Sequence, residues 1–396
     1  MNRVVVLGHS YLSRLSIIRA LGIYGYDITV MIVARDKHNV MIDCRSKYVN
    51  RVLVCPSFDG QTLVKVLLER CADKDAKTIL IPTSDVTVGM IDEHLDELKN
   101  YFLFPHINHE QGRIVHWMDK LVQKALAREM GMRVAESWLI DIRNQKYTIP
   151  NDIVYPCFTK PQMTIHGGKS VFKYCTNETE LRDFIHEIRQ KRDDVMLLVE
   201  RYLNIDKEYA VVGFSDGEKV YIPGVIYLEQ VSESHFGVAR LGKVLPVGSF
   251  QPLLEQFKEY VKAIGYIGLF DIDFLECEGK YYFCELNLRF GGSGDAITKM
   301  GGNLPLMLVE KLSMGHVQTF PSEITHQATF YNERVCLDDW YYGFLSKQDY
   351  RKIKCRADFG FIEDNNDPKP YKSFTQYKIL LGIKKAAKWL MGKNKK

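Results

Sequence analysis

Acidic and amide side chains gather in residues 268–297, which read GLFDIDFLECEGKYYFCELNLRFGGSGDAI. Two antiparallel strands around a turn at residues 278–279 would place Asp273 and Glu285 on neighbouring strands. Asn287 shares the face of Glu285, because side chains alternate along a strand. Two carboxylates and an amide oxygen are the hard ligands that Mg²⁺ takes, with phosphate oxygens completing its shell. The segment therefore predicts a magnesium site beside a substrate phosphate.

Arg289 follows on the same face and is expected to pair with phosphate oxygens through its planar guanidinium. The glycine-rich segment after it suits a close approach of the backbone to a ligand. The alternative is a hairpin with solvated charges on its outer face. That alternative fits poorly, because the other positions of both strands are apolar and the acids cluster at one end.

A second candidate is the segment MTIHGGKSV, residues 163–171, which contains Gly-Lys-Ser. A Walker loop requires a glycine five residues before the glycine of that tripeptide. The chain has Met163 there, so a Walker loop is excluded. On the residues alone, the segment is either a different phosphate cradle or an ordinary turn, and a turn is the commoner outcome.

Bulk composition restricts the class of protein. The chain has 396 residues, 46% hydrophobic and 26% charged, which is typical of a globular protein of two or three domains. A net charge of +4 is small for this length and does not indicate a nucleic-acid partner. Nine scattered cysteines without a C-x-x-C pair favour reduced thiols and no zinc site. Without a signal-peptide pattern or a run of eighteen apolar residues, we expect a cytoplasmic protein that does not span a membrane.

The first hundred residues alternate between apolar runs and amphipathic helical segments. We expect strands at 3–8, 27–34 and 78–85 and helices at 10–25, 58–74 and 88–100. This alternation predicts a parallel sheet covered by helices on both faces. A dinucleotide-binding fingerprint would need glycines where the chain has Ser10 and Ser13, so that interpretation is weak.

The pattern changes to α+β near residue 116. Asp119 is expected to cap a helix that ends before Gly131. Short strands, helices and hairpin turns should follow. The expected strands are 155–161, 170–175, 196–203, 208–229 and 268–288, with helices at 178–192 and 253–265 and turns at 215–219 and 277–281.

The metal segment resembles the ATP-grasp superfamily, which includes biotin carboxylase, carbamoyl phosphate synthetase, D-alanine–D-alanine ligase and D-aspartate ligase. An acid in a strand, a turn, and Glu-x-Asn-x-Arg after an aromatic strand carry the resemblance. It covers about residues 1 to 315 and implies ATP and Mg²⁺ as cofactors, with two ions held by Asp273, Glu285 and Asn287 and with Mn²⁺ as a substitute. The layout is closest to D-aspartate ligase-like proteins and to the carbamoyl phosphate synthetase large subunit.

The resemblance also implies the other nucleotide contacts, which match in order along the chain. They are a lysine opening the central helix, a lysine before a proline, a lid loop, a hinge strand ending in glutamate, and a ribose-binding acid. MTIHGGKSV would be the lid, holding phosphates through backbone N–H groups. Asp206 replaces a usual glycine before the ribose-binding acid. The matching residues are Lys120, Lys160, His166, Gly167, Gly168, Lys169, Ser170, Glu200, Tyr202, Leu203 and Glu208.

The implied fold combines α/β and α+β parts in four regions. An N-terminal parallel-sheet substrate domain (a pre-ATP-grasp domain) spans 1–115. A central and lid subdomain spans 116–205, and a C-terminal subdomain with the metal site spans 206–318. Residues 319–396 form a C-terminal extension with a basic amphipathic tail.

Superfamily members phosphorylate a carboxylate with ATP, and an amine or thiol attacks the acyl phosphate. The resemblance therefore implies an ADP-forming carboxylate–amine ligase. Arg289, Arg240 and Lys243 are expected to handle the carboxylate and the acyl phosphate. His235 is either a proton acceptor for the amine or an ordinary loop histidine. Asp85 either holds a substrate ammonium or caps the helix that follows.

The substrates are expected to be a small acid and an amine, of the amino-acid, peptide or cell-wall precursor type. One alternative is a ligase that adds an amino acid to a sugar or capsular polysaccharide precursor. Another is a non-catalytic nucleotide-binding regulator, which the intact metal ligands disfavour. Residues 378–396 carry seven lysines among apolar residues and are either a peripheral membrane contact or a docked helix with a frayed end. The sequence leaves open a lipid- or sugar-linked substrate and a homo-oligomer.

Overall fold

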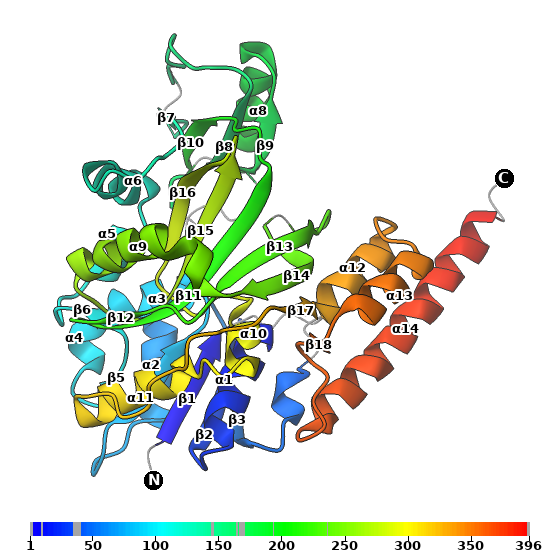
Figure 1. The fold of residues 1–396 in the computed structure, drawn as a ribbon. Coiled ribbons are helices and arrows are strands. Elements are labelled where there is room, and N and C mark those ends of the chain that lie inside the picture. The colour runs from blue at the N-terminus through cyan, green and yellow to red at the C-terminus, as the bar shows by residue number, and fades with distance from the viewer. Residues whose placement is uncertain are drawn as a thin grey trace.

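The computed structural model describes residues 3–8, 11–34, 41–143, 146–163, 165, 171–192, 194–235 and 237–393. It arranges them in three β-sheets with flanking helices, and a long helix at the C-terminal end projects from the body (Figure 1). This mixed α/β and α+β architecture confirms the expected fold class.

The N-terminal sheet is parallel and has the strand order β3-β2-β1-β4-β5. Alternate residues of β1 face opposite sides, so Val6 packs with α1 and Leu7 packs with α2. The expected parallel sheet with helices on both faces is therefore confirmed. Its elements are β1 (Arg3–Gly8), α1 (Tyr11–Gly22), β2 (Asp27–Val33), the 3₁₀ helix η1 (Asp43–Arg45), β3 (Val49–Cys55), α2 (Gly60–Arg70), β4 (Thr78–Pro82), α3 (Asp85–Asp92), α4 (Leu95–Leu98) and β5 (Phe102–Leu103).

The helix expected at 88–100 is wrong in one respect, because the segment forms two short helices, α3 and α4. His94 lies at the break, where its ring Nδ1 is 2.8 Å from the carbonyl oxygen of Met90. A side chain that bonds the backbone of the preceding turn competes with continuation of the helix.

The second sheet is antiparallel and has the order β7-β10-β8-β9, with α8 packed on one face. Asp119 caps the helix before it, since its Oδ1 accepts a hydrogen bond from the Leu121 N–H at 2.8 Å. Gly131 follows that helix with φ of 78°, as a residue past a helix end often does. The elements of this part of the chain, of which β6 belongs to the third sheet, are β6 (His106–Ile107), α5 (Arg113–Trp117), α6 (Lys120–Glu129), β7 (Ser137–Asp141), β8 (Cys157–Pro161), β9 (Lys173–Cys175), α8 (Glu178–Lys191) and β10 (Met196–Arg201).

The third sheet is the largest and runs in the order β16-β15-β11-β13-β14-β17-β18, with β12 beside β11 and β6 beside β15. Its long helix α9 packs under the aromatic face of β15 and β16. The elements are β11 (Lys207–Asp216), β12 (Val220–Tyr221), β13 (Val225–Val231), β14 (Ala239–Leu245), the 3₁₀ helix η3 (Val247–Phe250), α9 (Gln251–Ile264), β15 (Tyr266–Cys277), β16 (Lys280–Asn287), β17 (Ala328–Tyr331) and β18 (Phe359–Gly360).

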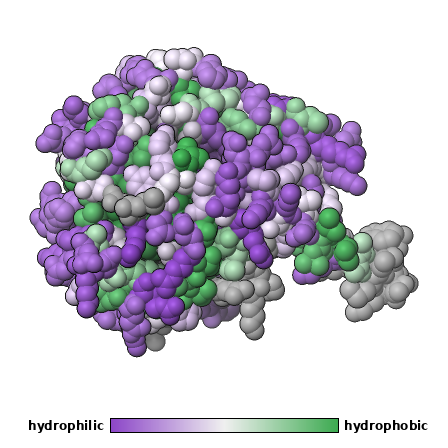
Figure 2. Space-filling model, turned by 90° about the horizontal axis from the view of Figure 1, so that it is seen from below, coloured by the Kyte–Doolittle hydropathy of each residue, from purple (hydrophilic) through white to green (hydrophobic). Residues whose placement is uncertain are grey.

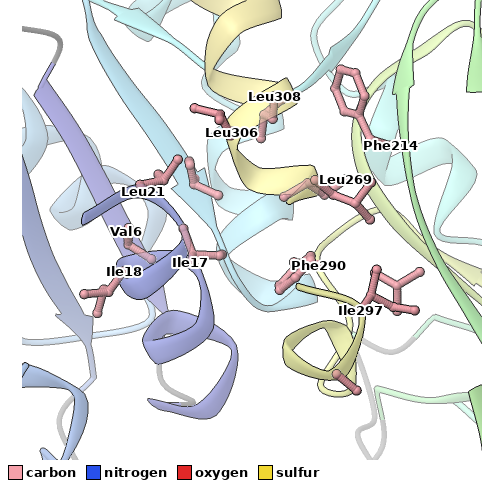
Figure 3. Packing of buried hydrophobic residues seen from close by; sticks show 14 of the residues in the cluster. Val6, Ile17, Ile18, Leu21, Phe214, Leu269, Phe290, Ile297, Leu306 and Leu308 are labelled. Atoms are coloured by element: carbon pink, nitrogen blue, oxygen red, sulfur yellow. The ribbon is translucent and has the colours of Figure 1, made fainter. Parts of the chain in front are cut away.

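Helices α10 (Gly294–Lys299) and α11 (Leu304–Met314) join the first sheet to the third. One continuous apolar core contains Ile17 of α1, Ile297 of α10, Leu308 of α11 and Leu269 of β15 (Figure 3). Every one of these side chains is at least 98% buried. This seam fixes the N-terminal sheet against the sheet that carries the predicted metal residues.

The C-terminal extension is packed into the body. It contributes α12 (Glu333–Tyr342), α13 (Lys347–Arg356) and α14 (Pro368–Lys393), together with strands β17 and β18. Arg19 of α1 ties it to the first sheet, because its Nε lies 3.1 Å from Asp367 Oδ2 and its other nitrogens donate to backbone carbonyls of the extension. Along the described chain, no helix is both long and apolar enough to cross a membrane. The domain boundaries expected at 115, 205 and 318 remain predictions.

Candidate active site

The hairpin of β15 and β16 brings the predicted metal residues together. Asp273 lies directly opposite Glu285 in the strand register, and the Asn287 Nδ2 donates to Asp273 Oδ2 at 3.3 Å. The turn at Glu278 and Gly279 has φ of 51° and 69°, which gives the two strands their antiparallel return. Two carboxylates and an amide therefore share one face of the sheet, as the period-two pattern predicts.

Lys120 and Glu285 link α6 to this hairpin. Lys120 is the first residue of α6, and its Nζ lies 3.2 Å from Glu285 Oε2. Burial alone would raise the pKa of Glu285, but Lys120 and Lys160 lower it to about 2. Glu285 is therefore ionised at any physiological pH and is ready to bind a cation.

Gln123 positions Lys120, a role that no pattern in the sequence indicates. Its Nε2 donates to the Leu286 carbonyl at 2.7 Å, and its Oε1 accepts from the Leu286 N–H at 2.9 Å. The side-chain amide thus satisfies both backbone groups of one residue on β16, as a neighbouring strand would. Since Gln123 lies one turn beyond Lys120, this clamp holds the lysine against Glu285.

A second charged group joins β8, β10 and α6. The Lys160 Nζ lies 2.9 Å from Glu200 Oε1, and Lys124 pairs with the same carboxylate oxygen. Burial would raise the pKa of Glu200, but the two lysines lower it overall. Burial lowers the pKa of Lys124 itself, with Glu200 opposing that effect. Sequence reasoning missed Lys124, although it lies four residues after Lys120 and therefore on the same helix face.

The donors fit a magnesium ion that shares its shell with phosphate. Asp273, Glu285 and Asn287 offer only oxygen ligands that suit Mg²⁺. Among the described residues, no group of three or more His, Cys, Asp or Glu side chains gathers closely enough to bind a metal alone. An ion here would therefore take further ligands from water or from a bound phosphate. The Lys120 Nζ lies 3.2 Å from Glu285 Oε2, and Lys160 lowers the pKa of the same carboxyl group, so both lysines could also pair with that phosphate.

Arg289 connects the hairpin to the end of the parallel sheet. Its Nε lies 2.7 Å from Asp85 Oδ1, and its Nη2 donates to Asn287 Oδ1 at 3.3 Å. Ser84 caps α3 by accepting from the Thr87 N–H, so the cap that sequence allowed for Asp85 is excluded. Asp85 is instead the first residue of α3 and pairs with Arg289, just beyond the hairpin of β15 and β16.

Asp271 is a third acid on the same face and was not predicted. It lies opposite Asn287 in the register and is 92% buried. Burial raises the pKa of Asp271 to about 7, although the nearby Arg289 opposes that rise. Its signal in the sequence is the Asp-x-Asp spacing, which puts Asp271 and Asp273 on one face of a strand.

The residues expected around the adenine and the ribose lie where the second and third sheets meet. Tyr202 follows β10, and its ring packs edge-on against Tyr174. Leu203 is half-buried beside it, and Glu208 lies on β11, where burial raises its pKa. Asp206, which replaces a glycine of the family pattern, accepts a hydrogen bond from the Glu278 N–H at 2.7 Å and so helps to close the metal hairpin.

The lid residues expected to cover the phosphates are His166, Gly167, Gly168, Lys169 and Ser170. They lie outside the described residues. The roles expected for them remain predictions.

The substrate-side residues expected on β14 have acidic partners of their own. The Arg240 Nη1 lies 3.5 Å from Asp339 of α12, and the Lys243 Nζ lies 2.9 Å from Glu229 of β13. The His235 Nε2 lies 3.1 Å from Asp338 Oδ2, which is also on α12. The C-terminal extension therefore holds the loop before β14 in place, and the catalytic roles of Arg240 and Lys243 remain predictions.

Comparisons with known proteins agree with this geometry. The sequence model of the ATP-grasp domain matches residues 125–300. The carbamoyl phosphate synthase large chain of Agathobacter rectalis is 26% identical over 202 residues, which cover 50% of this chain and 18% of that one. This chain thus spans less than a fifth of that relative's length, and the expected likeness to carbamoyl phosphate synthetase is confirmed.

Two solved structures share the fold. An L-amino acid ligase from Bacillus licheniformis matches with a TM-score of 0.63 at 14% identity, over 83% of this chain and 79% of that one. The ADP complex of purK, an N5-carboxyaminoimidazole ribonucleotide synthetase, matches with a TM-score of 0.62 at 15% identity, over 83% and 80%. The ATP-grasp domain model thus matches the part of the chain that includes the metal hairpin, and the solved structures share the fold.

Proposed function

We propose that this protein is an ATP- and Mg²⁺-dependent ligase that activates a carboxylate as an acyl phosphate and joins it to an amine, releasing ADP. One observation carries the proposal. Asp273, Glu285 and Asn287 share one face of the sheet. Arg289 contacts Asn287, and Lys120 pairs with Glu285. The two structural neighbours are named as an amino acid ligase and as an ADP complex, which supports the nucleotide and the reaction class.

The ion pairs of the site support an exchange of partners when substrates bind. Lys120 pairs with Glu285, and Lys160 pairs with Glu200. With a phosphate chain and a divalent cation bound, Lys120 and Lys160 would pair with phosphate oxygens, Glu285 would bind the cation, and Glu200 would keep Lys124 as its partner. Neither sign is left unpaired in a site where unpaired charge is costly.

The chain's own groups then have distinct tasks. Lys120 and Lys160 neutralise phosphate oxygens, and Arg289 pairs with the transferring phosphoryl group or with the acyl phosphate. Bound Mg²⁺ would withdraw charge from the same oxygens. The acid and the amine would meet where Arg289 joins the metal hairpin to Asp85 at the end of the first sheet, and holding them side by side makes amide formation effectively unimolecular.

The purely regulatory alternative has less support. A protein that only senses a nucleotide has no need of three metal ligands beside an arginine that faces a second substrate region. The ion pair between Arg289 and Asp85 joins the nucleotide half to the end of β4, where open parallel sheets bind ligands.

We also propose that the acceptor is presented at a membrane, as a lipid- or sugar-linked envelope precursor. On α14, Ile379, Leu380 and Ile383 are 60%, 47% and 63% exposed. Figure 2 shows hydrophobic residues on the part of the projecting segment that lies next to its grey tip. After Asp367 the chain has no acidic residue and carries these lysines: 369, 372, 378, 384, 385, 388, 393, 395 and 396. A basic helix with an exposed apolar stripe suits an anionic membrane surface.

ADP release from the full chain tests the ligase proposal. Pairs drawn from the common amino acids and cell-wall or sugar-nucleotide precursors would be screened with Mg²⁺ and ATP. We expect ADP only with a matched acid and amine, and none from Glu285→Ala. Glu276→Gln is the control, because Glu276 lies on β15 but bonds Lys207 at the hairpin end. Normal turnover by Glu285→Ala would reject the metal assignment.

A further inference from the structure

The carboxyl group of Asp271 is buried without a hydrogen-bond partner for one of its oxygens. The side chain is 92% buried, and its Oδ1 finds no partner in the described part of the chain. Leaving a buried carboxylate oxygen unsatisfied costs free energy, and native proteins rarely do so without a reason. A ligand that supplies a positive donor would remove this cost.

The surroundings of Asp271 are shaped around its carboxylate. A Cβ atom on Gly291 would lie 2.0 Å from Asp271 Oδ2, so only glycine leaves room for the carboxylate at this place. Gly291 opens the glycine-rich segment that leads into α10. The side chain therefore points from the metal face of β15 toward the backbone that borders the N-terminal sheet.

Arg289 faces more than one carboxylate. Its Nε is ion-paired with Asp85 Oδ1 at 2.7 Å, and Asp271 acts on the same guanidinium. Within the described residues, Arg289 donates to Asp85 and leaves Asp271 Oδ1 without a hydrogen-bond donor. Asp85 lies just past β4, at the strand ends where a parallel sheet binds its ligand.

We propose that Asp271, together with Asp85, binds the ammonium group of the amine substrate. This inference rests on the proposed ligase function and assigns its second substrate a place. An ammonium supplies a positive charge and N–H donors, one of which can bond Asp271 Oδ1.

The location also suits the chemistry. Asp271 lies two residues before Asp273 on the same strand face, which is about 7 Å along a strand. An amine held at Asp271 therefore waits beside the metal face where the carboxylate would be activated. The ammonium would first pass one proton to the Asp271 carboxylate, which frees the nitrogen lone pair. That nitrogen would attack the acyl carbon, forming the C–N bond while the C–O bond to phosphate breaks, and the second proton would leave with inorganic phosphate.

Two titrations of the full chain separate this inference from the proposed function. Calorimetry with Mg²⁺ and the non-hydrolysable ATP analogue AMP-PNP measures the nucleotide site alone. Ligand-observed NMR with Mg²⁺ and AMP-PNP then measures binding of the twenty common amino acids and ethanolamine. Each amine is compared with an analogue that lacks the amino group, such as propionate for alanine and ethanol for ethanolamine.

We expect at least one amine to bind the native protein while its deaminated analogue does not. Asp271→Asn, which keeps the size but removes the charge, should weaken that binding at least tenfold and leave AMP-PNP affinity within twofold. Glu276→Gln on the same strand should change neither. Equal amine binding by Asp271→Asn, or no amine binding by a native protein that holds AMP-PNP, would overturn the ammonium site. Absence of AMP-PNP binding would instead reject the proposed function, and amine binding would still decide the ammonium site.

Discussion

The Nε atom of Arg289 lies 2.7 Å from Oδ1 of Asp85, so the residue two positions beyond β16 is ion-paired to the first residue of α3. The two residues are 204 positions apart in the chain. This pair joins the metal hairpin to the strand ends of the N-terminal sheet. It therefore couples the place where phosphate is expected to the place where a second ligand is expected.

Replacing Arg289 should damage both catalysis and stability. We expect Arg289→Gln to slow ADP release about 100-fold, as removal of a group that stabilises transition-state charge does elsewhere. The melting temperature should also fall, because Asp85 and Asp271 both lose their cation. Arg143→Gln is the control, since Arg143 forms an exposed ion pair with Asp141 on β7. An unchanged rate in Arg289→Gln would mean that Arg289 does not face the reacting phosphoryl group.

Gln123 offers a prediction about stability. Gln123→Ala removes the two hydrogen bonds to Leu286 and a third to the Trp117 carbonyl, and it leaves the backbone N–H and C=O of Leu286 without these partners. We expect the free energy of unfolding to drop by about 2–3 kcal/mol, from the lost bonds and the unsatisfied backbone groups. Urea titration measures the change. Gln256→Ala on the exposed side of α9 should be nearly neutral, and an equal loss in both variants would contradict the clamp.

The parts of the fold that follow a local rule were predictable. The metal hairpin follows from side-chain alternation, and the helix at Lys120 follows from its Asp119 cap and from Gly131. The missed elements depend on distant partners. Strand β3 lies at a sheet edge with Val52 and Val54 exposed, so it lacks the buried pattern of a core strand. Strands β17 and β18 are short and depend on pairing with distant segments, since β17 pairs with β14 and β18 pairs with β17.

The candidate site shows the same division. Asp273, Glu285 and Asn287 share a hairpin, so spacing alone located them together. Asp271 and Lys124 had detectable signals, a period of two in a strand and a period of four in a helix. Gln123 had none, because its role depends on the edge of β16, more than 160 residues away. Partners in the C-terminal extension, such as Asp339 for Arg240, were equally beyond any local pattern.

Burial of Asp92, away from the nucleotide site, should make the free energy of unfolding depend on pH. It is 99% buried, and burial raises its pKa from the ordinary value of 3.8 to about 6. A carboxyl group with a raised folded pKa holds a proton that the unfolded chain has already lost, so stability falls as pH rises from about 4 to about 6 and then levels off. Two pKa units correspond to roughly 3 kcal/mol.

Asp92→Asn should remove that dependence. We expect native protein and variant to unfold at similar urea concentrations near pH 4 and to separate by pH 7, with the variant the more stable. Asn can still accept from the Val115 N–H that Asp92 Oδ2 accepts at 2.9 Å. Parallel pH profiles for the two proteins would show that Asp92 is not the group responsible.

The membrane proposal makes the last prediction. The apolar stripe of α14 and its lysines act together, so binding to vesicles should need anionic lipid and should weaken with salt. We expect the full chain to sediment with phosphatidylserine vesicles but not with pure phosphatidylcholine vesicles. Adding 0.5 M salt, which shortens the Debye length to about 4 Å, should release the bound protein. Ile379→Ser with Ile383→Ser should reduce the bound fraction at least fivefold. Phe320→Ser is the matched control, because Phe320 is 63% exposed but lies outside α14. Loss of binding in that control, or equal binding to both kinds of vesicle, would count against a specific role for α14.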